Sequence, residues 1–420
     1  MDLLIKNGHV VDPSQNLDDS LDIRIQGSFI LEIGRNLRQT SNVRVLDASG
    51  LVVAPGFVDM HVHLREPGQE DAETIETGTK AAAAGGFTAV ACMPNTNPVN
   101  DSISTTEFIL QKAKNHLVAV LPVGAITKEQ MGMELTGMSA LKEAGVVAFS
   151  DDGKPVIDSA IMRKAMETCV LLDAVLIDHC EDPYLFRGGA MNESRVSKEL
   201  GIRGIPSAAE EIMVSRNILL SKLTGAAVHL AHLSTAGSME LLRWAKSNKL
   251  PVSGEVTPHH FTLTDEAVAK YGTNAKMNPP LRSQQDVDAV LEALADGTVD
   301  VIASDHAPHP ISRKSVEFHE AAFGIIGLET SVSLGLDQLL NRGIIGLSRL
   351  IELYSLNPAQ ILKLERGIHT GAEANLTLFD PAKRVVIDAS RFQTKSRNTP
   401  FDGWSLQGAP VYTICKGQIV

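Results

Sequence analysis

The stretch FVDMHVH, residues 57–63, is an apolar run of strand-forming residues that ends in two histidines. Alternate residues of a β-strand point to the same side, so His61 and His63 can face one point beyond the end of the run. Taken alone, an HxH pair is a weak indication of a metal site, because a strand-end histidine is more often a hydrogen-bonded structural group. The pair gains meaning only if other strands of the chain end in the same way.

Seven further apolar runs follow, separated by longer segments rich in helix formers. This alternation is typical of a parallel α/β fold, and eight strand–helix units are the number that a closed (β/α)8 barrel needs. We therefore predict such a barrel. The eight runs are FVDMHVH from residue 57, TAVACMP from 88, LVAVLPVG from 117, GVVAFSDD from 145, AVLIDHCE from 174, AAVHLAHLS from 226, PVSGEVTPHH from 251 and VDVIASDHAPH from 299.

The two ends of the chain have a different texture. Short alternating segments such as LDIRIQGSFILEIG near the start, and NLTLFDPAKRVVI and VYTICKGQIV near the end, are typical of a β-meander. The two ends can pair into one small β-sandwich, with the barrel inserted between them. We predict residues 1–54 and 368–420 for the sandwich and residues 55–367 for the barrel.

Composition limits the classes of function. The 420 residues carry a net charge of −12, which argues against a nucleic-acid surface because such a surface needs clustered Lys and Arg. Four well-separated cysteines without CxxC spacing indicate free thiols in a reducing compartment. Neither a signal peptide nor an apolar run of about 18 residues is present. We expect a cytoplasmic protein that binds small molecules or proteins, with no nucleic acid and no membrane as partner.

Ligand-type side chains gather at the carboxyl ends of the predicted strands, which meet at one face of a barrel where active sites lie. Several imidazoles with carboxylates around one axis suit a borderline divalent metal, foremost Zn2+. The candidates are His61, His63, Asp151, Asp152, His179, His232 and Asp305. We interpret six other histidines as structural, with His259 and His260 kept as alternative ligands because they end the seventh run: His9, His116, His229, His259, His260 and His319.

Seven motifs at these strand ends jointly resemble the dihydroorotases of the amidohydrolase superfamily, in particular the long bacterial class I type. The resemblance covers nearly the whole chain. It implies a barrel with a flanking β-sandwich, a zinc site, and the reversible cyclisation of N-carbamoyl-L-aspartate to L-dihydroorotate and water in de novo pyrimidine biosynthesis. The motifs are HVHLREPG at 61–68, MPNTNP at 93–98, FSDDG at 149–153, DHCED at 178–182, AHLST at 231–235, MNPPLR at 277–282 and SDHAPH at 304–309.

The resemblance also implies a role for each residue at the barrel mouth. His61, His63 and Asp305 would hold one zinc, His179 and His232 a second, and an acid after the fourth strand would bridge them. Asp305 would also serve as general acid and base for a metal-activated hydroxide. Substrate contacts would fall on His63, Arg65, Asn95, Asn278, His309 and the backbone of Phe323 and Gly324. Arg65 suits this role because a guanidinium binds a carboxylate through two charge-assisted hydrogen bonds.

The fourth strand departs from much of the superfamily, where hydantoinases, dihydropyrimidinases, allantoinases and other dihydroorotases place a carboxylated lysine. Here the run ends in Asp151 and Asp152, and Lys154 lies beyond a glycine. The residues alone allow either acid as ligand; the family's ligand position favours Asp152. An aspartate side chain is shorter than a carboxylated lysine. The residues therefore leave open whether each subunit binds one zinc ion or two.

Two alternative functions remain: a related cyclic-amide hydrolase of the hydantoinase, dihydropyrimidinase or allantoinase type, and a structural subunit that supports aspartate transcarbamoylase. The first lacks its bridging lysine, and the complete ligand set argues against the second. We expect a homo-oligomer. The family resemblance also suggests a complex with aspartate transcarbamoylase. Residues 185–211, rich in glycine and charge, are interpreted as a loop that could order over the site or against a partner.

Overall fold

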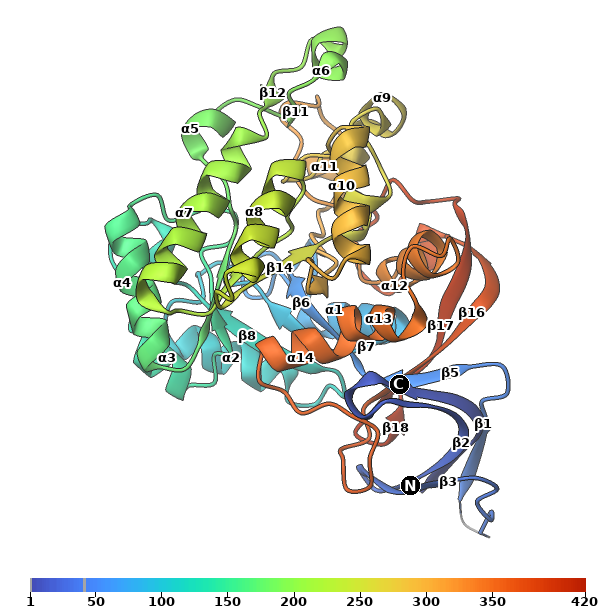
Figure 1. The fold of residues 1–420 in the computed structure, drawn as a ribbon. Helices are drawn as coiled ribbons and strands as arrows, with labels where there is room; N and C mark the ends of the chain where they lie inside the picture. Colours follow the sequence, from blue (N-terminus) through green and yellow to red (C-terminus); the bar gives the residue numbers. More distant parts are fainter. Residues whose placement is uncertain (1, 41–42) are drawn as a thin grey trace.

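A computed structural model describes residues 2–40 and 43–420, and a barrel of eight parallel strands forms its centre (Figure 1). The strands follow one another around the sheet in chain order. Each overlaps one of the eight runs predicted from the sequence, so the barrel prediction is confirmed. The strands are β6 (Phe57–Val62), β7 (Phe87–Cys92), β8 (Ala119–Gly124), β9 (Ala148–Phe149), β10 (Val175–Asp178), β13 (Val228–Leu230), β14 (Val252–Val256) and β15 (Val301–Ile302).

The barrel closes between its first and last strands. The backbone N–H of His63 donates to the carbonyl of His306 at 2.8 Å, and Val62 forms a parallel bridge with the same residue. The Asp59 carboxylate accepts from the backbone N–H of Ser304 at 3.1 Å. The ends of β6 and β15 therefore lie side by side at the mouth of the barrel.

Helices cover the outside of the barrel, and several begin at side-chain caps. Thr74 and Thr77 form a capping box at the start of α1, and Ser102 accepts from the N–H of Thr105 at the start of α2. The outer helices are α1 (Ile75–Ala84), α2 (Ile103–Ala113), α3 (Met138–Glu143), α4 (Ser159–Leu171), α7 (Ala208–Thr224), α8 (Ala236–Ser247), α10 (Gln284–Ala295), α12 (Ser331–Gly335), α13 (Leu347–Ile351) and α14 (Asn357–Ile361).

Strand β6 contains a bulge next to the site. Asp59 pairs with Val90 and Val62 with Cys92, so β6 takes one residue more than β7 over this stretch. Bulges re-aim side chains, and they are common beside active sites. Met60 packs in the cluster that fills the barrel, whereas Val62 packs outward against the helix layer.

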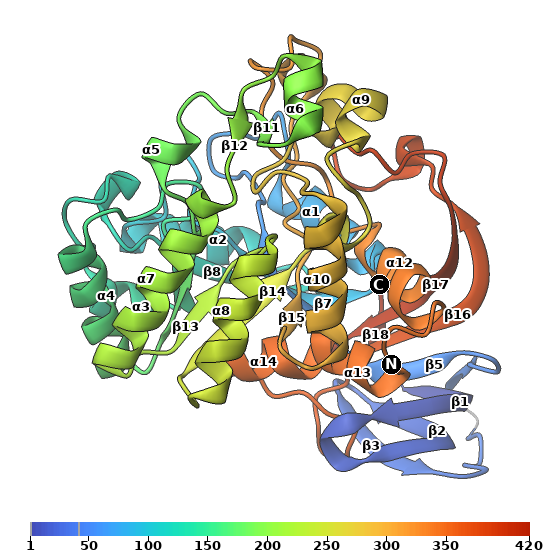
Figure 2. The same ribbon diagram turned by 45° about the horizontal axis from the view of Figure 1, so that its top comes forward.

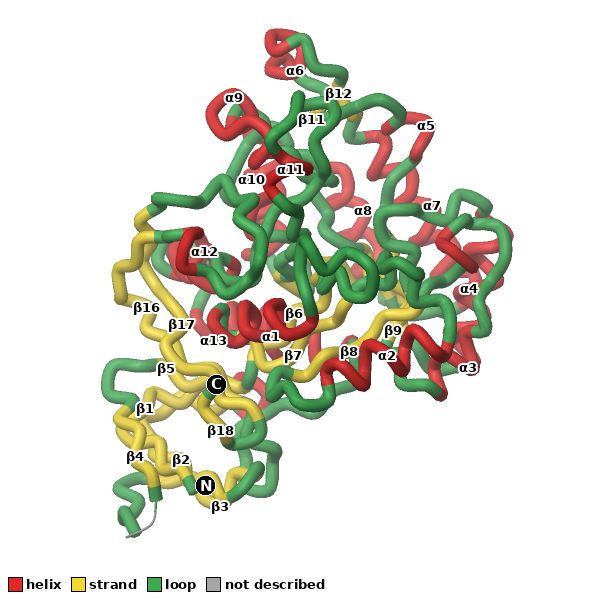
Figure 3. Tube along the Cα trace, turned by 180° about the vertical axis from the view of Figure 1, so that it is seen from behind, coloured by secondary structure: helices red, strands yellow, loops and turns green. Residues whose placement is uncertain are grey.

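The two ends of the chain form a second sheet beside the barrel (Figure 3). They meet where β5 pairs antiparallel with β16, Pro55 opposite Leu376. This arrangement confirms the predicted β-sandwich from both termini; its exact boundaries stay a prediction. The strands are β1 (Leu3–Asp12), β2 (Leu17–Gln26), β3 (Phe29–Gly34), β4 (Arg44–Asp47), β5 (Val52–Pro55), β16 (Leu376–Val386), β17 (Ser405–Cys415) and β18 (Gln418–Ile419).

Two segments leave these layers and reach the mouth of the barrel (Figure 2). The first, residues 183–205, is called the arm; it projects at the top of the molecule in Figure 1 and contains α5 (Pro183–Phe186), β11 (Met191–Asn192), α6 (Arg195–Leu200) and β12 (Gly204–Ile205). The second, residues 387–404, is called the strap and joins β16 to β17. Two short helices lie beside them, α9 (Ala267–Tyr271) and α11 (Ile311–Lys314). Within the described ranges, no helix combines the length and apolarity needed to span a bilayer.

Candidate metal centre and substrate pocket

The structure brings all six predicted metal ligands together at the carboxyl ends of the barrel strands. His61 lies on β6, and the others follow β6, β9, β10, β13 and β15. None of the six is more than 7% exposed. The residues are His61, His63, Asp152, His179, His232 and Asp305.

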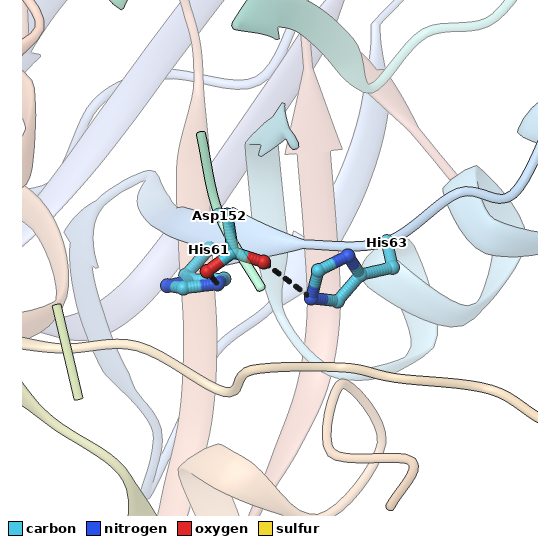
Figure 4. A group of neighbouring side chains, drawn as sticks. All are labelled: His61, His63 and Asp152. Carbon is cyan, nitrogen blue, oxygen red and sulfur yellow. Dashed lines mark ion pairs between the residues drawn. The ribbon is translucent and has the colours of Figure 1, made fainter. Parts of the chain in front are cut away.

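Asp152 belongs to both groups of possible metal ligands, and Figure 4 shows it beside two of its neighbours, His61 and His63. Its Oδ1 is 3.3 Å from His61 Nε2, and its Oδ2 is 3.6 Å from His63 Nε2. The same Oδ1 is 3.6 Å from His179 Nδ1 and 3.8 Å from His232 Nε2. Two ligand groups, one with His61 and His63 and the other with His179 and His232, therefore share a single carboxylate.

The spacing of these atoms fits a metal ion. Zinc binds nitrogen and oxygen donors at about 2.0–2.2 Å, so neighbouring ligand atoms of a tetrahedral site lie roughly 3.3 Å apart. His61 Nε2 and Asp152 Oδ1 match this separation, and both are buried without a hydrogen-bond partner. Buried polar atoms are normally paired, so two unpaired atoms aimed at one point indicate a place for a cation.

The second ring nitrogens of the β6 histidines are held by neighbours. His61 Nδ1 donates to Glu255 Oε1 at 2.7 Å, and His63 Nδ1 donates to Asn95 Oδ1 at 2.9 Å. Each contact occupies Nδ1 and turns Nε2 towards the carboxylates, and Nε2 is then the nitrogen that can bind a metal. Both rings are thus oriented for a common ligand.

Charge in the cluster favours a bound cation. Burial alone would raise the pKa of Asp152, but the charge of His61 and the contacts with His179 and His232 hold it well below its usual range. Asp305 behaves in the same way: burial would raise its pKa, and neighbouring histidines outweigh that effect. Its Oδ1 lies 3.1 Å from His63 Nε2. Both carboxylates are therefore ionised at neutral pH.

The structure separates the two acids after the fourth strand. Asp151 points away from the cluster: its Oδ1 accepts from the N–H groups of Ile126 and Thr127 at 2.8 and 3.1 Å, and its Oδ2 accepts from the Thr127 hydroxyl. Burial, only partly offset by these donors, raises the pKa of Asp151 to about 6. Asp151 therefore holds the loop after β8, and Asp152 faces the histidines.

Glu255 was not predicted from the sequence. It is fully buried on β14, contacts His61, and accepts at 3.1 Å from His229 Nε2 through its second oxygen. Burial would raise its pKa, but the charge of His61 and the contacts with His229 lower it to about 2. An acid inside the strand run SGEV was the available signal, because a buried charge needs partners.

A pocket of about 360 Å³ opens beside the cluster, and every predicted substrate residue lines it. Arg65 is 8% exposed, and its Nε donates to the Pro308 carbonyl at 3.2 Å. Asn278 Nδ2 lies 3.3 Å from His179 Nε2. The predicted substrate residues on the wall are His63, Arg65, Asn95, Asn278, His309, Phe323 and Gly324, and Glu181 and Phe186 line it as well.

One wall of this pocket is built from the residues that follow β15. His309 Nε2 donates to the Phe323 carbonyl at 2.8 Å. Burial, together with the charge of Arg65, lowers the pKa of His309 to about 3, so its ring is neutral. Burial also lowers the pKa of Arg65, to about 10, which leaves it charged at neutral pH. The charged guanidinium of Arg65 therefore lies next to the neutral imidazole of His309, an arrangement that suits a bound carboxylate.

The alternative ligands at the end of the seventh run have other surroundings. His260 contacts the Thr257 hydroxyl at 2.8 Å, and its Nε2 donates to the Pro279 carbonyl at 3.0 Å. Neither His259 nor His260 belongs to the two ligand groups found among the described residues. Burial lowers the pKa of both rings. His260 is therefore held by Thr257 and Pro279 rather than by the carboxylates of the cluster.

Comparison with known proteins agrees with this geometry. A family model described as dihydro-orotase-like matches residues 50–238. Dihydroorotases from Citrifermentans bemidjiense and Syntrophus aciditrophicus are 52% and 49% identical to this chain, each across 100% of it and 99% of their own length. Among solved structures, an L-hydantoinase from Arthrobacter aurescens has a TM-score of 0.90 at 25% identity, covering 100% of this chain and 96% of that one. A D-hydantoinase from Thermus sp. has a TM-score of 0.86 at 26% identity, covering 99% and 94%.

The solved neighbours and the strand-end cluster define the broad class first: this is a cyclic-amide hydrolase of the amidohydrolase superfamily. Within that class, relatives that share about half of all residues over their full length are decisive. The chain belongs to the dihydroorotase family.

Proposed function

We propose that this protein is a dihydroorotase, which interconverts N-carbamoyl-L-aspartate and L-dihydroorotate in de novo pyrimidine biosynthesis. One observation carries the proposal: a buried arginine, Arg65, faces the same pocket as the histidine–carboxylate cluster. Dihydroorotate combines a cyclic amide with a carboxylate, and this pocket offers a group for each. The full-length relatives support the same substrate.

We propose zinc as the metal, because four imidazoles and two carboxylates are the donor set that this ion prefers. His61, His63 and Asp305 would hold one ion, His179 and His232 a second, and Asp152 would contact both. The bound metal would supply a water molecule of lowered pKa and would polarise the amide carbonyl. The two ligand groups that share Asp152 support a capacity for two ions.

Asp305 is proposed to move the proton. In hydrolysis its carboxylate accepts a proton from the attacking water and donates it to the ring nitrogen as the C–N bond breaks. In the biosynthetic direction the same group takes the proton from the attacking carbamoyl nitrogen and releases it with the departing water. Its lowered pKa keeps it ionised and ready to act as a base.

The remaining pocket residues bind and orient the substrate. Arg65 would bind the carboxylate through two hydrogen bonds, beside the neutral His309. Asn95 and Asn278 can each donate to and accept from the amide groups of the ring. Phe186 of the arm packs against Phe323 with ring centroids 5.6 Å apart, and both residues line the pocket.

The assembly and location of the protein are also proposed. We expect a homo-oligomer, supported by the exposed apolar residues Ile212, Leu219 and Leu223 along α7. A complex with aspartate transcarbamoylase rests on the family resemblance. A cytoplasmic location is supported by the four cysteines, all of them free and buried. Analytical ultracentrifugation, with and without aspartate transcarbamoylase, tests both states of assembly.

The enzyme assay separates this proposal from its rivals. Purified protein loaded with zinc should hydrolyse dihydroorotate and leave hydantoin and dihydropyrimidines unchanged. Turnover of hydantoin without turnover of dihydroorotate would reject the proposal in favour of a hydantoinase. If neither substrate reacts while the protein still binds aspartate transcarbamoylase, a structural role would take its place.

A further inference from the structure

We propose that Asn398, in the strap, is a positioning residue for the substrate carboxylate. It holds the loop of His309 and the turn at Gly324, which form one wall of the pocket. The inference rests on the proposed function, because the carboxylate of dihydroorotate is the group that this wall would meet. Asn398 itself does not line the substrate pocket, so it acts through the residues that it holds.

The side chain of Asn398 makes three hydrogen bonds and uses both of its N–H donors. Its Nδ2 donates to the carbonyls of Ala307 and Gly324 at 3.0 and 3.1 Å. Its Oδ1 accepts from the backbone N–H of His309 at 3.2 Å. The residue is 4% exposed, and its own carbonyl accepts from Ile326 N–H at 3.0 Å. One amide thus connects the loop after β15, the turn at Gly324 and the strap.

The loop that Asn398 holds also carries a contact of Arg65. Arg65 Nε donates to the Pro308 carbonyl, and the two neighbours of Pro308, Ala307 and His309, are both bound by Asn398. A shift of this loop would therefore move the guanidinium as well as the imidazole. Positioning errors of about 1 Å at a binding group cost substantial rate or affinity.

The turn at Gly324 and the loop of His309 pack closely against each other in this wall. Gly324 has a φ of +119°, and a Cβ placed on it would lie 2.6 Å from the Ala307 Cβ and 3.5 Å from His309 Nε2. The turn therefore lies directly against the Ala307 side chain, and the Ala307 N–H donates to the Ile325 carbonyl at 2.8 Å. Asn398 adds a clamp across this contact, because it binds the carbonyls of both Ala307 and Gly324.

Other contacts keep the turn and the strap folded without Asn398. Lys314 Nζ donates to the carbonyls of Ala322 and Gly324 at 2.8 and 3.0 Å, which holds the turn from its other side. In the strap, Ser396 Oγ donates to the Ala72 carbonyl at 2.8 Å, and the Thr394 hydroxyl donates to the buried Glu73. Loss of the Asn398 amide is therefore a local change, and its distinct effect falls on the loop of His309.

The test compares Asn398→Ala and Asn398→Asp with the control Ser396→Ala, which removes a buried hydrogen bond of the same strap away from the pocket. In dihydroorotate hydrolysis, Asn398→Ala should raise KM about tenfold and change kcat less than about threefold. Asn398→Asp should raise KM further, because it turns a negative oxygen towards two carbonyls. Ser396→Ala should keep the KM of the wild type.

Two further measurements separate positioning from general damage. Calorimetry with orotate, which carries the same ring carboxylate, should show affinity lowered by the same factor as the rise in KM. Zinc content and the midpoint of thermal unfolding should match those of Ser396→Ala. If the wild type is active and both Asn398 variants keep its KM, this inference is wrong and the proposed function stands. A fall in kcat and zinc content at constant KM would also overturn this inference alone. Wild-type protein that neither turns over dihydroorotate nor binds orotate would overturn both this inference and the proposed function.

Discussion

Asp151 and Asp152 are adjacent in sequence and differ only in what surrounds them. Asp151 accepts backbone hydrogen bonds from the loop after β8, and Asp152 faces four imidazoles. The sequence predicted that an acid at this strand end would bind metal. It could not choose between the two by chemistry, because the choice depends on donors from residues 126 and 127, which only the folded loop brings near.

Substitution of each acid by its amide should therefore have different effects. Asp152→Asn should lose bound zinc and lower turnover by more than roughly 100-fold, because the carboxylate shared by both ligand groups is removed. Asp151→Asn should keep its zinc and lower the free energy of unfolding by about 1–3 kcal/mol, the usual cost of disturbing a buried acceptor. Metal analysis by mass spectrometry and urea unfolding provide the two readouts. Zinc loss in Asp151→Asn with retention in Asp152→Asn would reverse the assignment.

Glu255 contacts the proposed metal site through His61. Glu255→Gln keeps the shape of the side chain but removes the charge that orients the ring, so zinc affinity should fall about 10- to 100-fold. Competition with a fluorescent zinc chelator measures this. Glu240→Gln, an exposed carboxylate on α8, is the matched control and should bind zinc as the wild type does. Equal affinity in the two variants would remove Glu255 from the metal site.

At the scale of elements, the bulge in β6 determines which side chains reach the mouth. A strict alternation predicts His61 and His63 on one side of the strand, as found, but it also puts Met60 on the opposite side from them. In the structure Met60 packs inside the barrel, and His61 still reaches Asp152, because the extra residue turns the strand between them. The positions of the strands could be read from the sequence, whereas the bulge depends on the register with β7.

The attachment of the strap to the barrel should depend on pH. Glu329 accepts from the N–H groups of Gln393 and Thr394 at 2.8 and 3.1 Å, and burial raises its pKa from 4.5 to about 7. Because the native state then holds this proton more tightly than the unfolded state, its contribution is fully present below pH 4.5 and is lost as pH rises through about 7.

Urea unfolding between pH 4.5 and 8 tests this effect. Relative to Glu329→Gln, whose amide cannot ionise, the wild type should become progressively less stable as pH rises. Comparing the two proteins cancels the other titrating groups, which they share. A constant difference across this range would show that the carboxyl of Glu329 titrates as it does in the unfolded chain.

At the scale of the whole molecule, local patterns predicted the layers and missed the connections between them. The barrel and the sandwich from both termini follow from periodicity and composition. The strap does not: Asn398 contacts Ala307 across 91 positions, and Thr394 contacts Glu73 across 321. Such contacts leave no local signal, because each partner is an ordinary polar residue in its own segment. The family motifs located the residues that line the pocket, but not Asn398, which binds the loop of His309.

Metal binding should stabilise the entire fold, because the proposed ligands lie at the ends of five strands that assemble only in the native state. A ligand that binds only the native state, present at a free concentration of 100 times its dissociation constant, raises the free energy of unfolding by about 2.7 kcal/mol. Scanning calorimetry should therefore show a lower unfolding midpoint after treatment with EDTA and its recovery when zinc is restored. Asp152→Asn should show no such shift. If EDTA removes the zinc and the unfolding midpoint of the wild type does not change, the proposed coupling of metal binding to folding is wrong.

The pairing of β5 with β16 has a consequence for synthesis on the ribosome. The N-terminal strands emerge first, but the strand that joins them to the other chain end appears only after the whole barrel. At 5–20 residues per second this interval is on the order of tens of seconds. During that time β5 presents an unpaired edge, which is prone to mispairing. A nascent chain that stops before residue 387 would already contain all six proposed ligands and would lack the strap. Premature release would therefore leave the pocket wall without the hydrogen bonds of Asn398.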